Sequence, residues 1–455
     1  MPFDVQAIRR EFPITTVTFE APESGVQRPL IYFDHSASTH PCRRVIAGHI
    51  DFLQLRYANI HRGLHNLSMI STELFDRVSE VIARFIHAEM ARNCFVYTQN
   101  TTGALDLAAH VMSQIPGIVL STEMEHHSND LPYRQRGEVR HVRVQDDGTL
   151  DLEHLDSLLD AHRVKLVAVT GASNVTGIIP DIHEIAARAH RHGARILVDA
   201  AQLLAHHPVD VRPDQDPGHI DFLAAAGHKA YAPFGAAFLF GPCDLFDQAE
   251  PYQPGGGTVA CVTLDQVLWL PAPDRHHGGT PNIPGVIAMA SALEFLLEVG
   301  LPSIRAHELE LLRRAFDRLS AIDGLTLYGN LDPDRRLGVV SFNLEGIPHG
   351  VLSAVLNQEA GIATRNGRFC AHPYVHRLLG VKQPEELVAR LAAGERVELP
   401  GAVRASFGIY NTDEEVDVLA ETLRSIRDGH FAGTYDAAAL SHCNPALSEP
   451  RFEAS

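Results

Sequence analysis

Short apolar runs alternate with amphipathic stretches between residues 90 and 241. In stretches such as LDLEHLDSLLDAHRV and DIHEIAARAHRHGA the apolar residues recur at helical spacing, whereas the short runs are rich in Val, Ile, Leu and Ala. Several runs are continuously apolar, which is typical of parallel strands covered by helices on both faces. The pattern therefore predicts an α/β fold with a mostly parallel, seven-stranded sheet flanked by helices. The predicted strands are 94–98, 117–121, 139–144, 165–171, 195–200, 220–226 and 236–241.

The character of the sequence changes after residue 241. The stretch 242–282 is rich in Pro and Gly, which predicts a long functional loop region. A helical pattern follows over 283–322, and then strand-like pieces alternate with helices, which predicts a smaller α+β domain. We expect a large domain at 31–299, a small domain formed by 1–30 and 300–430, and a surface-packed or frayed tail at 431–455.

Composition and charge narrow the class of protein. The 455 residues carry 38 Lys and Arg against 56 Asp and Glu, a formal net charge of −18, which argues against a nucleic-acid partner. No apolar run approaches the roughly 20 residues that span a bilayer, and charges stand where a secretion signal would be apolar. The six Cys are scattered without CxxC spacing, which fits a reducing compartment. We therefore expect a cytoplasmic protein with no membrane partner.

Polar residues follow five of the predicted strands, at the edge where open α/β sheets bind ligands. Taken alone, each has an ordinary structural explanation, because an Asp or Thr there is usually a helix cap and a lone Lys is usually solvated. Their occurrence at five strand ends in order favours a shared function. The residues are Thr101, Thr102 and Gly103; His126 and His127; Asn174; Asp199 and Gln202; and His228 and Lys229.

Pyridoxal 5′-phosphate (PLP) would explain this set. The cofactor needs a lysine amine for a Schiff base and an acid for its ring nitrogen, and Lys229 and Asp199 supply these. Its phosphate needs a helix N-terminus with hydroxyl or imidazole donors. Thr101, Thr102 and His228 supply them. The remaining side chains suit the ring: Gln202 or Asn174 for its hydroxyl group, and His126 for stacking on its face.

Ten strings resemble those of a known family, in the family's order, and the resemblance runs from residue 32 to about 425. The chain resembles the fold-type I PLP enzymes of aminotransferase class V, and most closely the SUF-type cysteine desulfurases and selenocysteine lyases. The strings are YFDHSAST (32–39), NIHRGLHNLS (59–68), TTGALDLAA (101–109), EMEHHSND (123–130), SNVTGIIP (173–180), VDAAQLLAHHPVDV (198–211), GHKAYAPFG (227–235), GGTPN (278–282), ATRNGRFCAHP (363–373) and VRASFGIYNT (403–412).

The resemblance implies a role for each matching residue. Lys229 would form the Schiff base, and His126 would stack on the ring and take part in proton transfer. Cys370 would be the nucleophile. Other positions would hold the cofactor or the substrate: Asp199 at the ring nitrogen, Gln202 at the ring oxygen, Thr102 and His228 at the phosphate, Thr280 at the phosphate of the other subunit's cofactor, and Arg404, Arg365 and His35 at the substrate.

The activity that the resemblance implies is cleavage of the C–S or C–Se bond of L-cysteine or a related amino acid. The products would be alanine and a persulfide on Cys370, beside which Arg365 and Arg368 favour the thiolate form. The implied partners are a second subunit, which makes a homodimer with shared active sites, and a sulfur-acceptor protein. A C–S lyase, epimerase or aminotransferase-like enzyme of secondary metabolism, acting on a larger substrate, is the alternative, and it would not need Cys370.

Several positions depart from the family pattern. They are Ala226 where Ser is usual, Gln99-Asn100 before the Thr pair, Phe369 before the nucleophile, Arg275-His276-His277, and an insertion at 381–400. The cofactor set survives these changes, whereas Phe369, His276, His277 and the insertion are predicted to line or cover the substrate side. The substrate is therefore left open.

Two other classes are disfavoured. An NAD-binding protein needs GxGxxG after an early strand, and the only glycine run is GGG at 255–257. A metal protein is suggested by 27 His, but pairs such as His126-His127 are adjacent and would diverge. We expect no metal.

Overall fold

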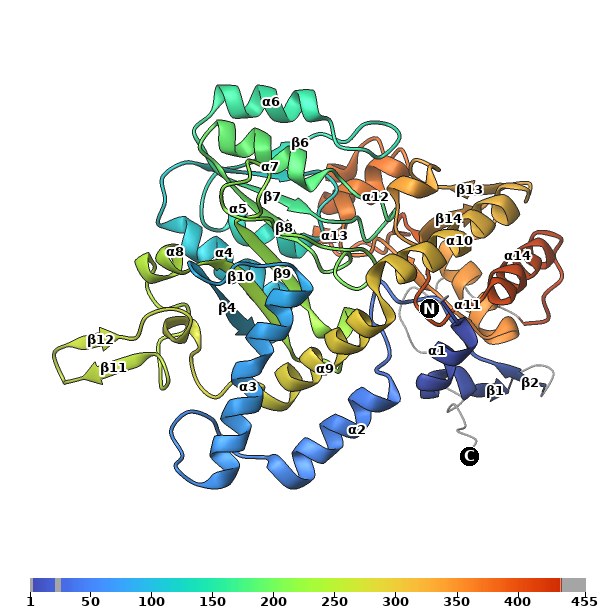
Figure 1. Cartoon of the computed structure of the whole chain (residues 1–455). Coiled ribbons are helices and arrows are strands. Elements are labelled where there is room, and N and C mark those ends of the chain that lie inside the picture. Colours follow the sequence, from blue (N-terminus) through green and yellow to red (C-terminus); the bar gives the residue numbers. More distant parts are fainter. Residues whose placement is uncertain (1–2, 21–25, 434, 436–455) are drawn as a thin grey trace.

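The computed structural model describes residues 3–20, 26–433 and 435 of the chain. Its centre is a seven-stranded sheet with helices on both faces (Figure 1), as the sequence predicts. All neighbouring strands are parallel except β10, which is antiparallel to both of its neighbours. In sheet order the strands are β4 (Asn93–Thr98), β10 (Ala237–Pro242), β9 (Phe222–Ala226), β8 (Arg195–Asp199), β7 (Val164–Thr170), β5 (Ile118–Thr122) and β6 (Val139–Val142).

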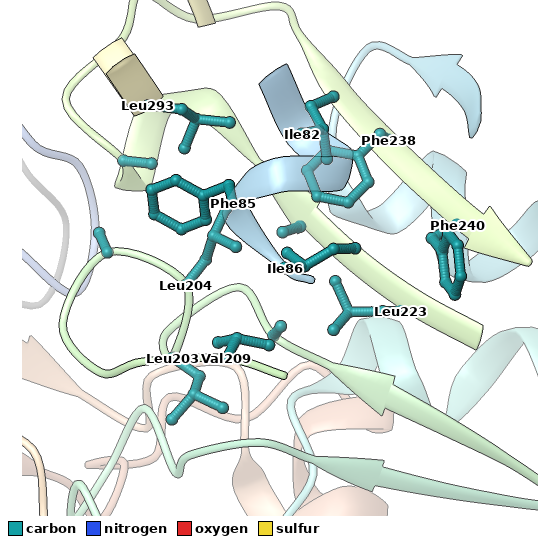
Figure 2. Packing of buried hydrophobic residues seen from close by; sticks show 14 of the residues in the cluster. Ile82, Phe85, Ile86, Leu203, Leu204, Val209, Leu223, Phe238, Phe240 and Leu293 are labelled. Carbon is teal, nitrogen blue, oxygen red and sulfur yellow. The ribbon is translucent and has the colours of Figure 1, made fainter. Parts of the chain in front are cut away.

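Each face of the sheet packs against its own hydrophobic core. In β8, Ile196 and Val198 enter one cluster while Leu197 enters the other, as the alternation of side chains along a strand requires. Figure 2 shows part of the first cluster, to which Phe85 at the end of a long helix and Leu223 of the sheet both belong. The helices around the sheet are α2 (Arg43–Asp51), α3 (Asn66–Phe85), α4 (Thr101–Ser113), α5 (Leu131–Arg134), α6 (Leu152–Ala161), α7 (Ile182–Arg191), α8 (Cys243–Gln248) and α9 (Ile283–Val299).

The region 242–282 is more ordered than a loop, so this part of the sequence prediction was wrong. It contains α8 and an antiparallel hairpin, β11 (Val259–Val262) with β12 (Val267–Trp269), which projects from the body (Figure 1). The strands are too short to show a clear period among the Pro and Gly residues.

The helical pattern at 283–322 forms two helices instead of one. Gly300, with a φ of +91°, separates α9 from α10 (Leu301–Ser320). Among the described residues no single helix has the length and apolar composition of a membrane span. The pair α9 and α10 has the length and apolar composition of a membrane span only when the two helices are taken together, and they are bent by 77° at the break between them.

A second, antiparallel sheet forms beside the first. Its order is β13 (Leu325–Leu327), β14 (Val339–Leu344), β17 (Ala402–Ser406) and β16 (Arg365–Gly367). With α10, α11 (His349–Ala360) and α14 (Asp413–Arg427) it encloses its own core, which matches the predicted α+β part. A capping box of Thr412 and Glu415 starts α14.

The N-terminal segment joins the two parts. Phe12, which follows α1 (Val5–Glu11), packs edge-on against Phe295 of α9, and β3 (Ile31–Tyr32) pairs in parallel with β15 (Ile362–Ala363). The predicted domain boundaries stay a prediction, and the predicted tail lies outside the described residues except for 431–433 and 435. The remaining elements are β1 (Thr18–Glu20), β2 (Gln27–Pro29), α12 (His372–Leu378) and α13 (Pro384–Ala392).

One buried carboxylate fastens α7 to the sheet. Asp221 accepts hydrogen bonds from Arg195 Nη1 (2.6 Å) and from the Ile196 N–H (2.8 Å). Its carboxylate also lies 2.8 Å from His190 Nε2 and 3.6 Å from His219 Nε2. Burial raises the pKa of Asp221, but the hydrogen bonds from the two histidines and the Arg195 charge outweigh it and hold this pKa well below the usual range.

Among the described residues, His190, His219 and Asp221 bring three potential metal ligands within 4.8 Å of one another. The two imidazole rings are stacked, with centroids 4.1 Å apart, and nearly parallel rings cannot both aim a nitrogen lone pair at one ion. Each Nδ1 lies 2.7 Å from a backbone carbonyl, that of Pro217 or Asp216. The geometry is therefore that of an ion-paired cluster.

We predict that Asp221→Asn lowers the free energy of unfolding by about 3 kcal/mol, because it removes the charge that Arg195 and the histidines share. The hydrogen bond from Asp221 raises the pKa of His219. A raised folded-state pKa adds stability below the unfolded value of about 6.5 that is lost as the pH rises through the folded value.

The free energy of unfolding that Asp221→Asn loses should therefore be larger at pH 6 than at pH 8.5. Thermal unfolding of the variant and of the natural protein at each pH measures it. Asp323→Asn, which removes an exposed carboxylate 3.7 Å from Arg427, is the matched control and should change little at either pH. An equal loss for Asp221→Asn at the two pH values would contradict the role given to His219.

Candidate active site

A cavity of about 610 Å³ lies between the carboxyl ends of the parallel strands and the smaller sheet. This is the edge at which the sequence predicts the ligand. The lining residues follow five strands of the large sheet (β4, β5, β7, β8 and β9), and others come from the smaller sheet. The cavity brings together these predicted site residues: Thr101, Thr102, His126, Asn174, Asp199, Gln202, His228, Lys229, Arg365, Cys370 and Arg404.

Lys229 and Asp199 form the charged centre of the cavity. Lys229 follows β9 and lines the cavity. Burial lowers its pKa to about 8, against the opposing charge of Asp199. Burial likewise raises the pKa of Asp199, which ends β8 and accepts a hydrogen bond from the Ala201 N–H (3.0 Å). A buried amine near neutrality is a competent nucleophile, and a buried carboxylate favours a cationic partner.

His126 stands at the same cavity as a neutral ring. Burial, followed by the charge of Lys229, lowers its pKa to about 3. Its Nδ1 accepts a hydrogen bond from the Ser128 N–H (3.1 Å), so the ring proton is on Nε2. Gln202 is also oriented, because its Nε2 donates to the Ser36 carbonyl (2.8 Å).

Glu125, which precedes His126, was missed by the sequence reasoning. Burial raises its pKa to about 8. Its carboxylate accepts hydrogen bonds from Asn129 Nδ2 (2.6 Å) and from the Thr170 N–H (3.0 Å), where β7 pairs with Asp199. Glu125 thereby holds the end of β7, the strand that pairs with β8 at Asp199. It lies inside the quoted string EMEHHSND, but only the fold brings it to that position.

The N-terminus of α4 forms the anion-binding end of the cavity. Asn100 caps the helix by accepting the Gly103 N–H (2.9 Å). Thr102 Oγ1 lies 2.7 Å from Ser128 Oγ, and the buried Thr101 Oγ1 has no protein partner. Burial lowers the pKa of His228 beside it to about 4, which leaves a neutral imidazole. Backbone N–H groups, hydroxyls and the helix dipole together suit a phosphate group.

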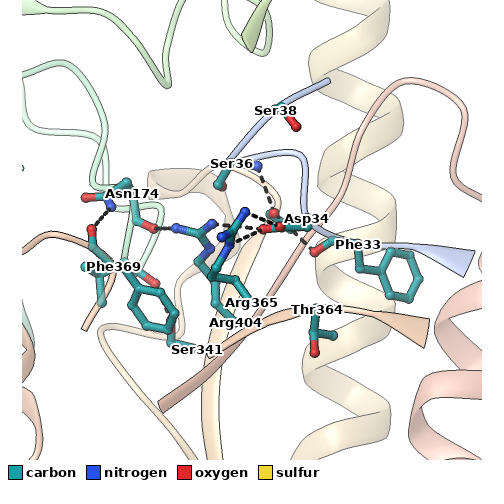
Figure 3. Close-up of polar contacts among 12 residues, drawn as sticks. Phe33, Asp34, Ser36, Ser38, Asn174, Ser341, Thr364, Arg365, Phe369 and Arg404 are labelled. Carbon is teal, nitrogen blue, oxygen red and sulfur yellow. Dashed lines mark hydrogen bonds and ion pairs between the residues drawn. The ribbon is translucent and has the colours of Figure 1, made fainter. Parts of the chain in front are cut away.

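Two arginines form the opposite wall. Arg365 of β16 and Arg404 of β17 are direct partners in the antiparallel sheet, and both contact Asp34 (Figure 3). Arg365 Nη2 lies 2.7 Å from Asp34 Oδ2, and Arg404 Nη2 lies 3.1 Å from Oδ1. The sequence does not reveal the role of Asp34, because its partners Arg365 and Arg404 lie 331 and 370 residues further along the chain.

Cys370 is exposed and lies in a tightly anchored turn. It and Phe369 both adopt left-handed backbone conformations, with φ of 53° and 51°. Asn174 Nδ2 donates to the Phe369 carbonyl (2.7 Å), and the His127 N–H donates to the Cys370 carbonyl (2.7 Å). The Arg404 guanidinium stacks on the Phe369 ring, 4.9 Å from its centroid. Residues far apart in sequence therefore set the direction of the thiol.

Two predicted site residues lie elsewhere. Thr280 lines a neighbouring hollow of about 440 Å³ and does not line the cavity with Lys229. His35 is buried behind the cavity wall, between Tyr32 and Tyr410, with 1% of its surface exposed. Of the departures from the family pattern, Phe369 lines the cavity, whereas His276, His277 and the insertion at 381–400 do not. The sequence predicts that these features line or cover the substrate side, and in the structure these three do not line the cavity itself.

The geometry can accommodate an aromatic cofactor with an aldehyde and a phosphate. Lys229 supplies the amine, Asp199 the partner for a ring nitrogen, and the orphaned Thr101 hydroxyl with α4 the phosphate site. On the far side, two guanidinium groups and a thiol face the same space.

Comparisons with known proteins agree with this geometry. The sequence profile of the aminotransferase class-V family matches residues 31–419. A cysteine desulfurase of Haloferax volcanii is 35% identical over 442 residues, which cover 94% of this chain and 98% of its own. A probable cysteine desulfurase of Halalkalibacterium halodurans is 36% identical and covers 88% of this chain and 95% of its own.

Solved structures show the same fold. The apo structure of a cysteine desulfurase from Thermococcus onnurineus has a TM-score of 0.79 at 31% identity, over 88% of this chain and 95% of that one. A cysteine desulfurase of Escherichia coli in an S-sulfonic acid form has a TM-score of 0.79 at 27% identity, over 95% of this chain and all of that one. The resemblance noted in the sequence is thus confirmed: the chain belongs to the aminotransferase class-V family, among relatives that are cysteine desulfurases.

Proposed function

We propose that the protein is a PLP-dependent cysteine desulfurase that removes sulfur from L-cysteine, or sulfur or selenium from a close analogue. The observation that carries the proposal is the meeting of Lys229, Cys370 and the arginines Arg365 and Arg404 in one cavity. A lyase or epimerase would need the lysine and the arginines but not an exposed thiol facing them.

PLP fits the residues of this cavity. Lys229 would hold its aldehyde carbon, Asp199 its ring nitrogen and the N-terminus of α4 its phosphate, where the Thr101 hydroxyl lacks a protein partner. When bound, the cofactor supplies an electron-accepting ring for the charge released at the substrate Cα. The buried Asp199 carboxylate favours the protonated ring, because a positive partner offsets the burial that raises its pKa.

The chain's own groups orient the amino acid and move its proton. Arg404 and Arg365 present guanidinium groups to the substrate carboxylate. The Lys229 amine, whose pKa burial lowers to about 8, takes the Cα proton. His126, neutral and protonated on Nε2, covers the cavity from the side of β5.

Sulfur leaves through Cys370. Its thiolate attacks the substrate sulfur, so an S–S bond forms while the C–S bond breaks and its electron pair stays on carbon. The proton lost from the Cys370 thiol balances the one gained at Cβ, and the products are alanine and a Cys370 persulfide. Because Cys370 is exposed, the persulfide is accessible to a sulfur-acceptor protein or thiol. A cytoplasmic location remains part of the proposal.

We also propose a homodimer with shared active sites. Most of the exposed large hydrophobic residues lie in two segments, 50–70 and 262–268, which include Leu55 and Leu264. Concentrated exposed apolar surface of this kind marks interaction sites. The hollow that contains Thr280 adjoins the cavity through the shared residues Gln99, Asn100 and Gly235, so a partner subunit placed there would adjoin both.

We predict that Cys370→Ala lowers sulfide and alanine release from L-cysteine by at least about a hundredfold, because Cys370 supplies the only thiol among the described residues that line the cavity. The measurement is a screen of amino acids for both products with a thiol reductant present. Cofactor absorbance should remain, since Cys370 does not hold PLP. Cys243→Ala, a half-buried thiol on α8, is the control and should keep full activity. Undiminished release in Cys370→Ala would rule out the desulfurase mechanism.

We predict that borohydride reduction links PLP to Lys229 alone. The chain has only three lysines, at 165, 229 and 382, so peptide mass spectrometry can assign the label unambiguously. Lys229→Ala should carry no label, whereas Lys382→Ala should be labelled like the natural protein. A label that persists in Lys229→Ala would disprove the assignment of this residue.

We predict that the double variant Leu55→Asp with Leu264→Asp shifts the protein from dimer to monomer at micromolar concentration, because charges would have to be buried at the interface. Light scattering coupled to size exclusion measures the mass. Val388→Asp, which charges an exposed apolar residue of α13, is the control. A double variant with the mass of the natural protein would place the interface elsewhere.

A further inference from the structure

We propose that Asp34 is a specificity-determining residue that limits the carboxylate subsite to substrates with one carboxylate group. The inference rests on the proposed function and deepens it, because it names monocarboxylic amino acids as the substrate class. It starts from the group of charges at Arg365, Arg404 and Asp34 (Figure 3).

The two guanidinium groups are forced together by the sheet. Arg365 and Arg404 are register partners in β16 and β17, so their side chains share one face. Like charges in this position repel each other. Asp34 lies between them: its Oδ2 lies 2.7 Å from Arg365 Nη2, and its Oδ1 accepts from both Arg404 Nη2 (3.1 Å) and Arg365 Nε (3.4 Å). The carboxylate thus offsets part of a repulsion that strand pairing imposes.

Asp34 is fixed by its own backbone and not only by the arginines. It forms an isolated bridge with Ser406 of β17, and its carbonyl accepts the Ala37 N–H (3.0 Å). The next turn is fastened in the same way, because the Ser36 N–H donates to Ser406 Oγ (2.9 Å). The carboxylate is therefore a permanent part of the subsite.

Arg404 has other anchors, and all of them are neutral. Its Nη1 donates to the Asn174 carbonyl (2.9 Å), and its guanidinium stacks on the Phe369 ring. Its side chain is 3% exposed, whereas that of Arg365 is 51% exposed. Neutralising Asp34 would consequently leave Arg404 in place and increase the positive charge of the subsite.

Arg365, Arg404 and Asp34 together carry a net charge of +1 at this end of the cavity. Two guanidinium groups and one carboxylate leave a single net positive charge, which matches one substrate carboxylate. The other cation of the cavity, Lys229, has Asp199 as its counter-charge. A second substrate carboxylate would find no further cation among the described residues that line the cavity and would face Asp34, so dicarboxylic compounds should be rejected.

The test measures anion binding by titration calorimetry on the holoenzyme, with propionate as the monoanion and succinate as the dianion. Asp34→Asn keeps the shape of the side chain and removes its charge. We expect the affinity for succinate to rise at least about tenfold more than that for propionate, because the dianion gains from the added charge twice. Asp34→Glu, which keeps the charge, should retain the selectivity of the natural protein, and Asp323→Asn controls for the loss of a distant surface carboxylate.

Two results would overturn the proposal. One is an equal change in affinity for the two anions in Asp34→Asn. The other is loss of both affinities in a variant whose melting temperature and cofactor absorbance are normal, because Asp34 would then only hold the arginines in place. The readout involves no sulfur release, so the titration can be repeated in Cys370→Ala. Failure of the desulfurase proposal would appear in the product screen and leave this measurement unaffected.

Discussion

The structure depends on keeping several charges out of water while pairing each of them. Asp199 and Arg404 are buried, with 5% and 3% of their surface exposed, and Lys229 is partly buried beside them. A buried charge without a partner would be strongly destabilising. Burial lowers the pKa of Arg404 to about 10, and Asp34 counteracts it. Lys229 and Asp199 stand at the ends of strands of the parallel sheet, Arg404 stands on the smaller antiparallel sheet, and its partner Asp34 follows β3. Residues of both sheets thus line the same cavity. Formation of the cavity and association of the two sheets are therefore one event, and neither sheet builds the site alone.

Much of the fold could be predicted because it follows from local periodicity. All seven predicted strands of the central sheet occur within about two residues of their predicted ends, since each is a short strand-like run between turns and several are continuously apolar. The hairpin β11–β12 was missed for the opposite reason: its residues are mostly exposed, so no buried face imposes a pattern. Gly300 ended a helix within an otherwise continuous helical pattern, which composition alone does not reveal.

The residues of the candidate site likewise fall into those that the sequence predicts and those that only the fold reveals. Residues at strand ends, such as Asp199 and Lys229, could be placed because the topology of a parallel sheet brings them together. Asp34 could not, and neither could the contact of His127 with the Cys370 turn, because both depend on parts of the chain that the fold brings together from far apart. His35 shows the converse error: it stands in a matching string, yet its neighbours in space are tyrosine rings and not the cavity.

The nucleophile and the carboxylate subsite are mechanically one unit. Left-handed conformations at two consecutive residues other than glycine cost about 1 to 3 kcal/mol each, so Phe369 and Cys370 must be held in place by their surroundings. Asn174 does so through its side chain, while its carbonyl receives Arg404, and the Arg404 guanidinium covers the Phe369 ring. The arginine that meets the substrate thus also supports the turn that aims the thiol. Any change at the Arg404–Asn174 contact must alter both substrate affinity and the direction of Cys370, and a substitution there cannot be assigned to only one of the two roles.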